Sequence, residues 1–121
     1  MGCPFCSPDQ IIAENNLAYA IYDRYPVSPG HLLIITKRHI ESFFDASEAE
    51  RQALNKLIGE CKNLLDIKYS PDGYNIGVNC GSAAGQTIFH VHIHLIPRYF
   101  GDMEDPSGGV RGVIPEKRKY T

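Results

Sequence analysis

Residues 87–97 constrain the fold most strongly, because apolar and histidine side chains alternate along this segment. Alternation with a period of two is the pattern of a β-strand whose two faces have different surroundings. His90, His92 and His94 share one face of this predicted strand, and the apolar residues share the other. The apolar face, with Phe89, Val91, Ile93 and Leu95, predicts a sheet packed over a core.

Other segments predict the elements around this strand. Two apolar runs, at residues 17–23 and 31–36, flank a turn with two prolines and a glycine and predict an antiparallel strand pair. Residues 74–79 alternate as a further strand. Strands combined with one long helix predict an α+β domain whose sheet is mainly antiparallel.

The helix is predicted to begin at Ser47, which forms a Ser-x-x-Glu capping box with Glu50. Apolar residues follow at helical spacing and predict the buried face, whereas Glu50 and the other charged residues are expected to face away from it. This predicted apolar face comprises Leu54, Leu57, Ile58, Cys61, Leu64 and Leu65.

Length and charge limit the possible classes of protein. A chain of 121 residues suffices for one domain, which we assign to residues 1–121 with an aperiodic C-terminal tail from about residue 99 to 121. The net charge of -2 argues against binding a nucleic acid polymer. No apolar stretch approaches the roughly 20 residues that cross a membrane, and no secretory signal is recognised. We therefore expect a cytoplasmic protein whose cysteines are thiols.

The histidine row permits several interpretations. Alternate residues on a strand lie roughly 6.6 Å apart, so the row spans about 13 Å and cannot place all three imidazoles on one ion. Three interpretations of the row remain. It is a solvated strand face, an adventitious metal patch, or a catalytic imidazole flanked by two imidazoles that orient it. A neutral imidazole, available near its ordinary pKa of about 6.5, is a nucleophile toward phosphorus. The loop of small residues at 80–86 favours the catalytic interpretation, because backbone amides there can approach phosphate oxygens.

Cys3 and Cys6 form a Cys-x-x-Cys pair with the spacing of zinc ligands. A tetrahedral site requires two more ligands from elsewhere in the chain. Without them, the two cysteines are free thiols near the terminus.

Residues 85–98 (GQTIFHVHIHLIPR) resemble the signature of the histidine triad (HIT) family, in which His-x-His-x-His precedes two apolar residues. Residues 26–35, 37–39 and 74–79 resemble further segments of the family, in the same order. The resemblance implies a HIT-like fold, with a five-stranded sheet and one long helix. It also implies a nucleotide hydrolase or nucleotidyl transferase that cleaves at the α-phosphate, with His92 forming a nucleotidyl-histidine intermediate.

The same resemblance implies roles for other residues. His94 and His31 would bind the phosphate or polarise the site, and the remaining candidates would contact the substrate. These are Asp23 at the ribose, Asn79 as a polar contact, Gln86 and Thr87 near the phosphate or leaving group, and Phe5 at the base. The residues alone also allow Asp23 to be a turn residue, Gln86 a loop residue and Phe5 a buried aromatic.

Family members with a Cys-x-x-Cys pair imply that His39 and His90 complete a structural Zn²⁺ site with Cys3 and Cys6. The resemblance also implies a homodimer and a small AMP-type ligand with adenine or guanine. The substrate is a nucleoside phosphoramidate or a dinucleoside polyphosphate, and the tail lacks the tryptophan of some phosphoramidases. Two other functional hypotheses are a nucleotide-binding regulatory module with little turnover and a zinc-dependent interaction protein.

Overall fold

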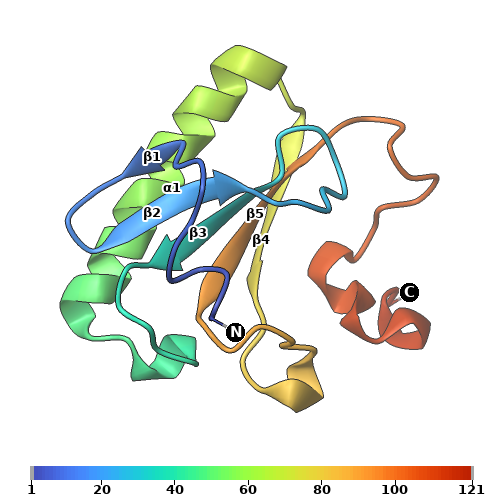
Figure 1. Cartoon of the computed structure of the whole chain (residues 1–121). Coiled ribbons are helices and arrows are strands. Elements are labelled where there is room, and N and C mark those ends of the chain that lie inside the picture. The colour runs from blue at the N-terminus through green and yellow to red at the C-terminus, as the bar shows by residue number, and fades with distance from the viewer. Residues whose placement is uncertain (1, 121) are drawn as a thin grey trace.

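A computed structural model describes residues 2–120 and contains a five-stranded antiparallel sheet with one long helix, as predicted. The strand order is β1-β2-β3-β5-β4 (Figure 1). The strands are β1 (Ala13–Glu14), β2 (Ala18–Tyr22), β3 (Leu32–Thr36), β4 (Gly73–Val78) and β5 (His92–Arg98). The two-residue strand β1 is too short to give a periodic signal, and the sequence pattern did not locate it.

Helix α1 (Glu48–Tyr69) begins where the capping box predicts. The Ser47 hydroxyl accepts from the Glu50 backbone N–H, and the Glu50 carboxylate accepts from the Ser47 N–H. The prediction that Glu50 faces away from the buried side is wrong, because its carboxylate is buried and bonded to the Arg38 guanidinium at 2.7 and 3.0 Å. Leu64 is 47% exposed and lies at the margin of the apolar face rather than within it.

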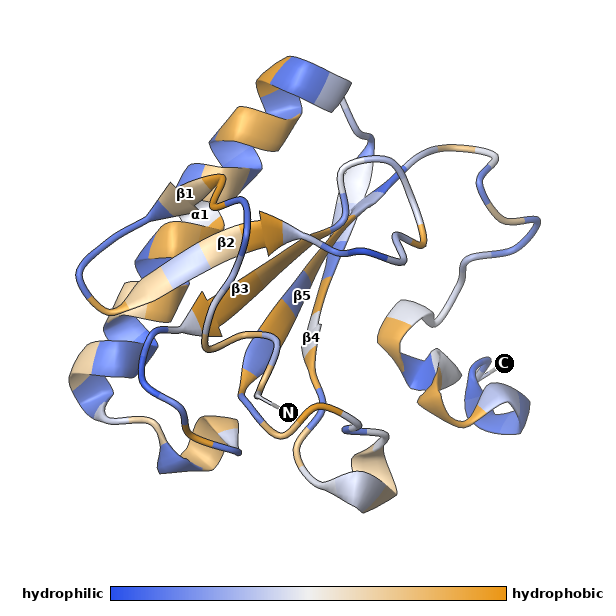
Figure 2. Ribbon diagram, viewed as in Figure 1, coloured by the Kyte–Doolittle hydropathy of each residue, from blue (hydrophilic) through white to orange (hydrophobic). Residues whose placement is uncertain are grey.

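The sheet has two differently covered faces. Helix α1 covers the face that carries the main core, to which β2, β3 and β5 contribute alternate apolar residues (Figures 1 and 2). Cys61 lies within this core, as predicted. The core comprises Ala18, Ala20, Leu32, Ile34, Leu54, Leu57, Cys61, Leu65, Ile93 and Leu95. The opposite face is crossed by the N-terminal segment, drawn dark blue in front of the sheet.

The strand predicted from residue 87 begins at His92 instead. The preceding segment leaves the sheet and is held by the loop after β3, since the Val91 N–H donates to the Ile40 carbonyl at 2.8 Å. Val91 packs in a small separate cluster with Ile40 and Ala46, and Phe89 is 40% exposed rather than in the core. Alternation alone does not reveal this departure, because Val91 is still buried.

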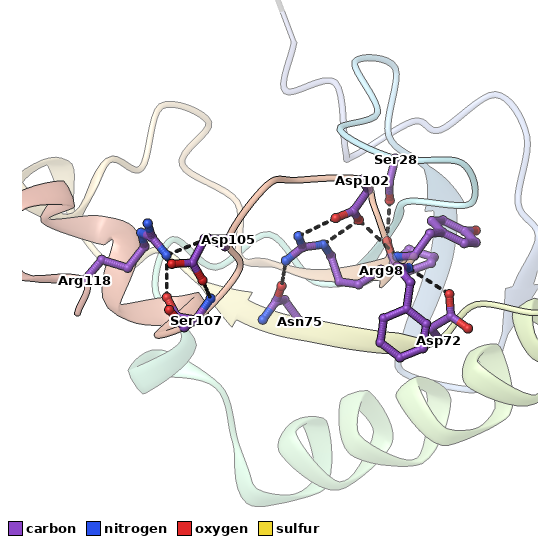
Figure 3. Close-up of polar contacts among 11 residues, drawn as sticks. Ser28, Asp72, Asn75, Arg98, Asp102, Asp105, Ser107 and Arg118 are labelled. Carbon is purple, nitrogen blue, oxygen red and sulfur yellow. Dashed lines mark hydrogen bonds and ion pairs between the residues drawn. The ribbon is translucent and has the colours of Figure 1, made fainter. Parts of the chain in front are cut away.

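Residues 99–120 follow the last strand and include two 3₁₀ turns, η3 (Gly109–Val113) and η4 (Pro115–Lys117). The start of this tail is fixed by Arg98, which donates to both carboxylate oxygens of Asp102 at 2.8 Å and to Asn75 of β4 at 2.6 Å (Figure 3). Within residues 2–120, none of the helices has the length and apolar character needed to cross a membrane.

Candidate active site and metal site

His92 and His94 project from β5 on the face opposite α1. Their Cα partners on β3 are Ile35 and Leu33, and the two imidazole centroids lie 5.3 Å apart. Ile35 and Leu33 belong to a small apolar cluster with Phe5 and Tyr19 on the same face. The two histidines therefore lie at the edge of an apolar surface rather than in a solvated row.

The His92 ring is oriented by a backbone group. Its Nδ1 lies 2.8 Å from the carbonyl oxygen of His90. A carbonyl oxygen only accepts hydrogen bonds, so Nδ1 carries the proton of the neutral ring. This tautomer leaves the Nε2 lone pair of His92 free, which is the form that a nucleophilic imidazole requires.

His31 and His94 form a chain of hydrogen bonds with a defined direction. The Val27 backbone N–H donates to His31 Nδ1 at 3.1 Å, so the proton of neutral His31 is on Nε2. His31 Nε2 then donates to His94 Nδ1 at 2.9 Å, which places the proton of neutral His94 on its Nε2. His94 can therefore donate a hydrogen bond while it is uncharged.

Asp23 lies beside this pair, with its carboxylate 3.4 Å from His31 Nε2 and 3.9 Å from His94 Nδ1. Burial lowers the pKa of His31, and Asp23 opposes this change. Burial, followed by repulsion from His31 and His92, lowers the pKa of His94 to about 4, again against the effect of Asp23. His94 is consequently neutral at pH 7, as the direction of its hydrogen bonds requires.

The loop between β4 and residue 87 is closed by the Gln86 side chain. Gln86 Oε1 accepts from the Gly81 N–H at 2.8 Å, and Gln86 Nε2 donates to the Glu41 and Ile88 carbonyls. Gly81 and Gly85 have φ values of 90° and 94°, which residues with a side chain rarely adopt. Gln86 is buried and engaged with the backbone, so its amide shapes the loop.

The remaining predicted substrate contacts lie at different places. The Phe5 ring is 5.0 Å from the His92 ring, centroid to centroid. Asn79 is half-buried and directly follows Val78, the last residue of β4, whose partner on β5 is Ile93. Thr87 is exposed, immediately after Gln86. The structure thus gathers Phe5, Asp23, His31, His92 and His94, with Asn79 at the end of the adjacent strand.

A second cluster contains the four predicted metal ligands, Cys3, Cys6, His39 and His90, whose ligand atoms all lie within 4.8 Å of one another. His90 Nδ1 is 3.3 Å from Cys3 Sγ and 3.6 Å from Cys6 Sγ, and Cys6 Sγ is 3.2 Å from His39 Nδ1. Zn–S and Zn–N bonds of ordinary length at a tetrahedral angle separate sulfur and nitrogen by about 3.6 Å. These four residues therefore fit a zinc site.

The protonation pattern of His90 supports this fit. His90 Nε2 donates to the Thr36 carbonyl at 2.7 Å, so the lone pair of the neutral ring is on Nδ1, the atom that faces both thiols. The Phe5 backbone N–H donates to Cys3 Sγ at 3.4 Å, a bond that a thiolate favours. Burial and the neighbouring Cys3 raise the pKa of Cys6, an effect that a bound cation would reverse.

The comparison with known proteins decides the family. The HIT domain matches residues 5–101, which is most of the chain. The chain belongs to the HIT family. It is 39% identical to a HIT-like protein of Mycoplasma genitalium over 104 residues, spanning 81% of this chain and 74% of that protein.

Two other relatives bear on the site. An AP-4-A phosphorylase of Mycobacterium tuberculosis is 31% identical over 93 residues, which are 76% of this chain but only 48% of the longer enzyme. A crystal structure of a Zn-bound histidine triad family protein from Mycobacterium smegmatis superposes with a TM-score of 0.77. It is 31% identical in sequence, and the match covers 85% of this HIT chain and 79% of that one.

Sequence reasoning missed several groups that hold this HIT site together. They are the backbone N–H of Val27, the carbonyls of Thr36 and His90, and the Tyr19 hydroxyl, which donates to the Phe5 carbonyl. Backbone groups carry no side-chain signal, so no residue pattern identifies them. The position of Tyr19 on the apolar strand β2 gave no indication that its hydroxyl binds the N-terminal segment.

Proposed function

We propose that this HIT protein is a nucleotide hydrolase or nucleotidyl transferase that cleaves at the α-phosphate through a nucleotide covalently bound to His92. The observation that carries the proposal is the 2.8 Å contact between His92 Nδ1 and the His90 carbonyl. It fixes the tautomer in which His92 Nε2 has the free lone pair, beside a neutral donor on His94.

In the first step, His92 Nε2 attacks the α-phosphorus. A P–N bond forms and the bond from phosphorus to the leaving group breaks, with the bonding electrons going to the leaving group. His94 Nε2–H is placed to donate to a phosphate oxygen or to the leaving group, and His31 supports His94 from behind. In the second step, the oxygen of water attacks phosphorus and the P–N bond breaks, with the bonding electrons returning to His92 Nε2. The attacking water loses one proton to the solvent, so that the nucleotide and free neutral His92 are released.

The substrate contacts follow from the surroundings of this centre. Phe5 and its apolar neighbours would receive the base, and Asp23 would accept hydrogen bonds from ribose hydroxyls. Asn79 and Thr87 would contact the phosphate or leaving group directly, and Gln86 would act by holding the loop around it. The carboxylate of Asp23 would leave the His31–His94 pair when it binds a ribose, since it is 3.4 Å or more from both rings.

The substrate class is an AMP-type nucleotide, either a phosphoramidate or a dinucleoside polyphosphate. The relative named for AP-4-A supports the second. The base is adenine or guanine. The ligand set of Cys3, Cys6, His39 and His90 would hold a structural Zn²⁺ that contributes folding free energy and ties the N-terminal segment to the sheet.

A homodimer is part of this proposal, and so is a cytoplasmic location. Strand β4 is at the edge of the sheet and exposes Ile76, while α1 exposes Leu64 and Ile67. Edge strands with apolar side chains favour pairing with another chain. Sedimentation velocity at micromolar concentration should give twice the mass of one chain, and a single-chain species alone would contradict the dimer.

The test of the mechanism is to trap the intermediate. The zinc-loaded protein is mixed with a panel of adenylated amines and diadenosine polyphosphates and quenched rapidly without acid, because a P–N bond is acid-labile. Peptide mass spectrometry should then find AMP on His92. His92→Asn should form no adduct and lose turnover by several orders of magnitude, yet still bind AMP.

The other hypotheses predict different results. Tight AMP binding without an adduct or turnover on any substrate would support the nucleotide-binding regulatory module. AMP on a residue other than His92 would refute the proposed nucleophile. A zinc-dependent interaction protein would bind zinc but not AMP, and its site would leave the hydrogen-bonded His31–His94 pair without a function.

A further inference from the structure

The segment between the two cysteines of the metal cluster carries Phe5, and this residue is fixed at three points. Its N–H donates to Cys3 Sγ, and its carbonyl accepts from the Tyr19 hydroxyl. The residue as a whole is 7% exposed and packs with Tyr19, Leu33 and Ile35. Phe5 is thus both part of the metal-binding segment and part of the surface beside His92.

The ring of Phe5 lies between the two clusters. It meets the His92 ring edge-on, with 5.0 Å between centroids and 61° between planes, and the His90 ring with 6.1 Å and 85°. A second link runs through His90 itself, whose ring faces the thiols and whose carbonyl accepts from His92 Nδ1. The metal cluster therefore touches His92 by two independent routes.

The Cys-x-x-Cys segment is held to the sheet by Phe5 and by the cluster itself. Residues 2–12 precede the first strand, and the Cys6 N–H bond to the Cys3 carbonyl, at 3.1 Å, closes only a local turn. The sulfur–nitrogen contacts of 3.2 to 3.6 Å are weak as hydrogen bonds but become bonds to a shared ion when zinc is present. We therefore expect metal binding to add to the order of this segment and to the placement of Phe5.

We propose that Phe5 is a positioning residue that couples metal binding at the Cys3–Cys6–His39–His90 cluster to nucleotide binding beside His92. This inference rests on the proposed function, because it takes the His92 face as the nucleotide site. Coupling between two binding equilibria is reciprocal. Zinc should therefore raise the affinity for AMP by the same factor by which AMP raises the affinity for zinc.

The experiment measures both sides of this linkage on the full chain. AMP affinity is measured by calorimetry for the zinc-loaded and zinc-free protein, and zinc affinity by competition with a chromophoric chelator, with and without saturating AMP. We expect both ratios to be about tenfold, within the usual range of coupling factors. Ratios of one in a protein that binds both ligands overturn the coupling, as does a protein that binds no zinc.

A variant that keeps its metal avoids the risk that the zinc-free protein loses its fold. Zinc-loaded Phe5→Ala should retain one zinc per chain, bind AMP about tenfold more weakly, and show a coupling factor well below the wild-type value, with only the route through the His90 carbonyl remaining. Phe5→Leu, which restores apolar volume, should recover part of both effects. Phe44→Ala removes an exposed aromatic ring outside the cluster and should match the wild type. Wild-type AMP affinity and coupling in Phe5→Ala overturn the role of Phe5.

A spectroscopic readout separates positioning of His92 from a general loss of structure. Nitrogen-15 NMR of the imidazoles should show the Nδ1–H tautomer of His92 as the dominant form in the zinc-loaded wild type and a mixed population in Phe5→Ala. Failure of the inference and failure of the proposed function are distinguishable. An AMP adduct on His92 together with a coupling factor of one would refute only the inference. Absence of AMP binding and of any adduct would refute the proposed function.

Discussion

Replacing Glu50 by Gln should destabilise the protein in a pH-dependent manner. Glu50 is buried at the first turn of α1, where it accepts from the Arg38 guanidinium twice and from the Ser47 N–H. The bonds to Arg38, against the cost of burial, hold the pKa of Glu50 at about 2, compared with an ordinary value of 4.5. That difference corresponds to about 3 kcal/mol. Because the Arg38 side chain is 59% exposed, we reduce the expected loss at pH 7 to about 2 kcal/mol.

The sign follows from proton linkage. A carboxyl whose pKa is lowered by folding contributes its stability above the unfolded value of 4.5 and loses it as the pH falls toward 2. Urea unfolding of wild type and Glu50→Gln should therefore show a difference that is largest at pH 7 and nearly vanishes at pH 2. Glu48→Gln removes an exposed charge from the same helix turn and should cost less than about 0.5 kcal/mol.

Two results would refute this reasoning. One is a loss of stability in Glu50→Gln that is no larger than the loss in Glu48→Gln. The effect would then be only the interaction of an acidic residue with the helix dipole. The other is a difference between Glu50→Gln and wild type that stays constant from pH 7 to pH 2. Comparing the proteins at the same pH keeps any loss of metal common to all of them.

Three further predictions concern the site and its frame. Burial lowers the pKa of His94 to about 4, so the midpoint of its NMR titration should fall well below the ordinary value of 6.5. Because the unfolded chain then binds the proton more tightly, the free energy of unfolding should decrease as the pH drops from 6.5 toward 4. A titration midpoint near 6.5 would contradict this prediction. Gly30→Ala should lower stability by roughly 1–3 kcal/mol in urea unfolding, because φ is +90° and the new Cβ would lie 3.0 Å from the Tyr69 ring. Gln86→Leu should cost about 2 kcal/mol by leaving the Gly81 N–H and its other backbone partners unpaired; unchanged thermal stability would show that water replaces the amide.

The sequence predicted those features that depend on side-chain pattern. The capping box located the start of α1, an apolar run located β3, and alternation located β4, the two strands that flank β5. The side-chain pattern failed for Glu50. Helical periodicity assigns a charged residue to the polar face of the helix, and it contains no information about the partner Arg38. The same limitation applies to Leu64, which has the spacing of the apolar face but is 47% exposed.

The sequence pattern mispredicted the start of β5 for a different reason. The position of this start explains how the site is built. The pattern placed His90, His92 and His94 in one equivalent row. In the structure the chain leaves the sheet before His92, because Gln86 and Val91 bind the carbonyls of Glu41 and Ile40 in the loop after β3. These are side-chain and backbone bonds to a remote loop, and alternation does not report them.

Because β5 begins only at His92, His90 and His92 have separate surroundings. His90, outside the strand, directs Nδ1 toward the thiols of Cys3 and Cys6, whereas His92, the first residue of β5, lies on the apolar face beside Phe5. The His90 carbonyl still reaches His92 Nδ1, so the separation leaves one hydrogen bond between the two sites. A continuous strand would direct such carbonyls to neighbouring strands as ladder bonds. The late start of β5 therefore leaves the His90 carbonyl available to fix the tautomer of His92.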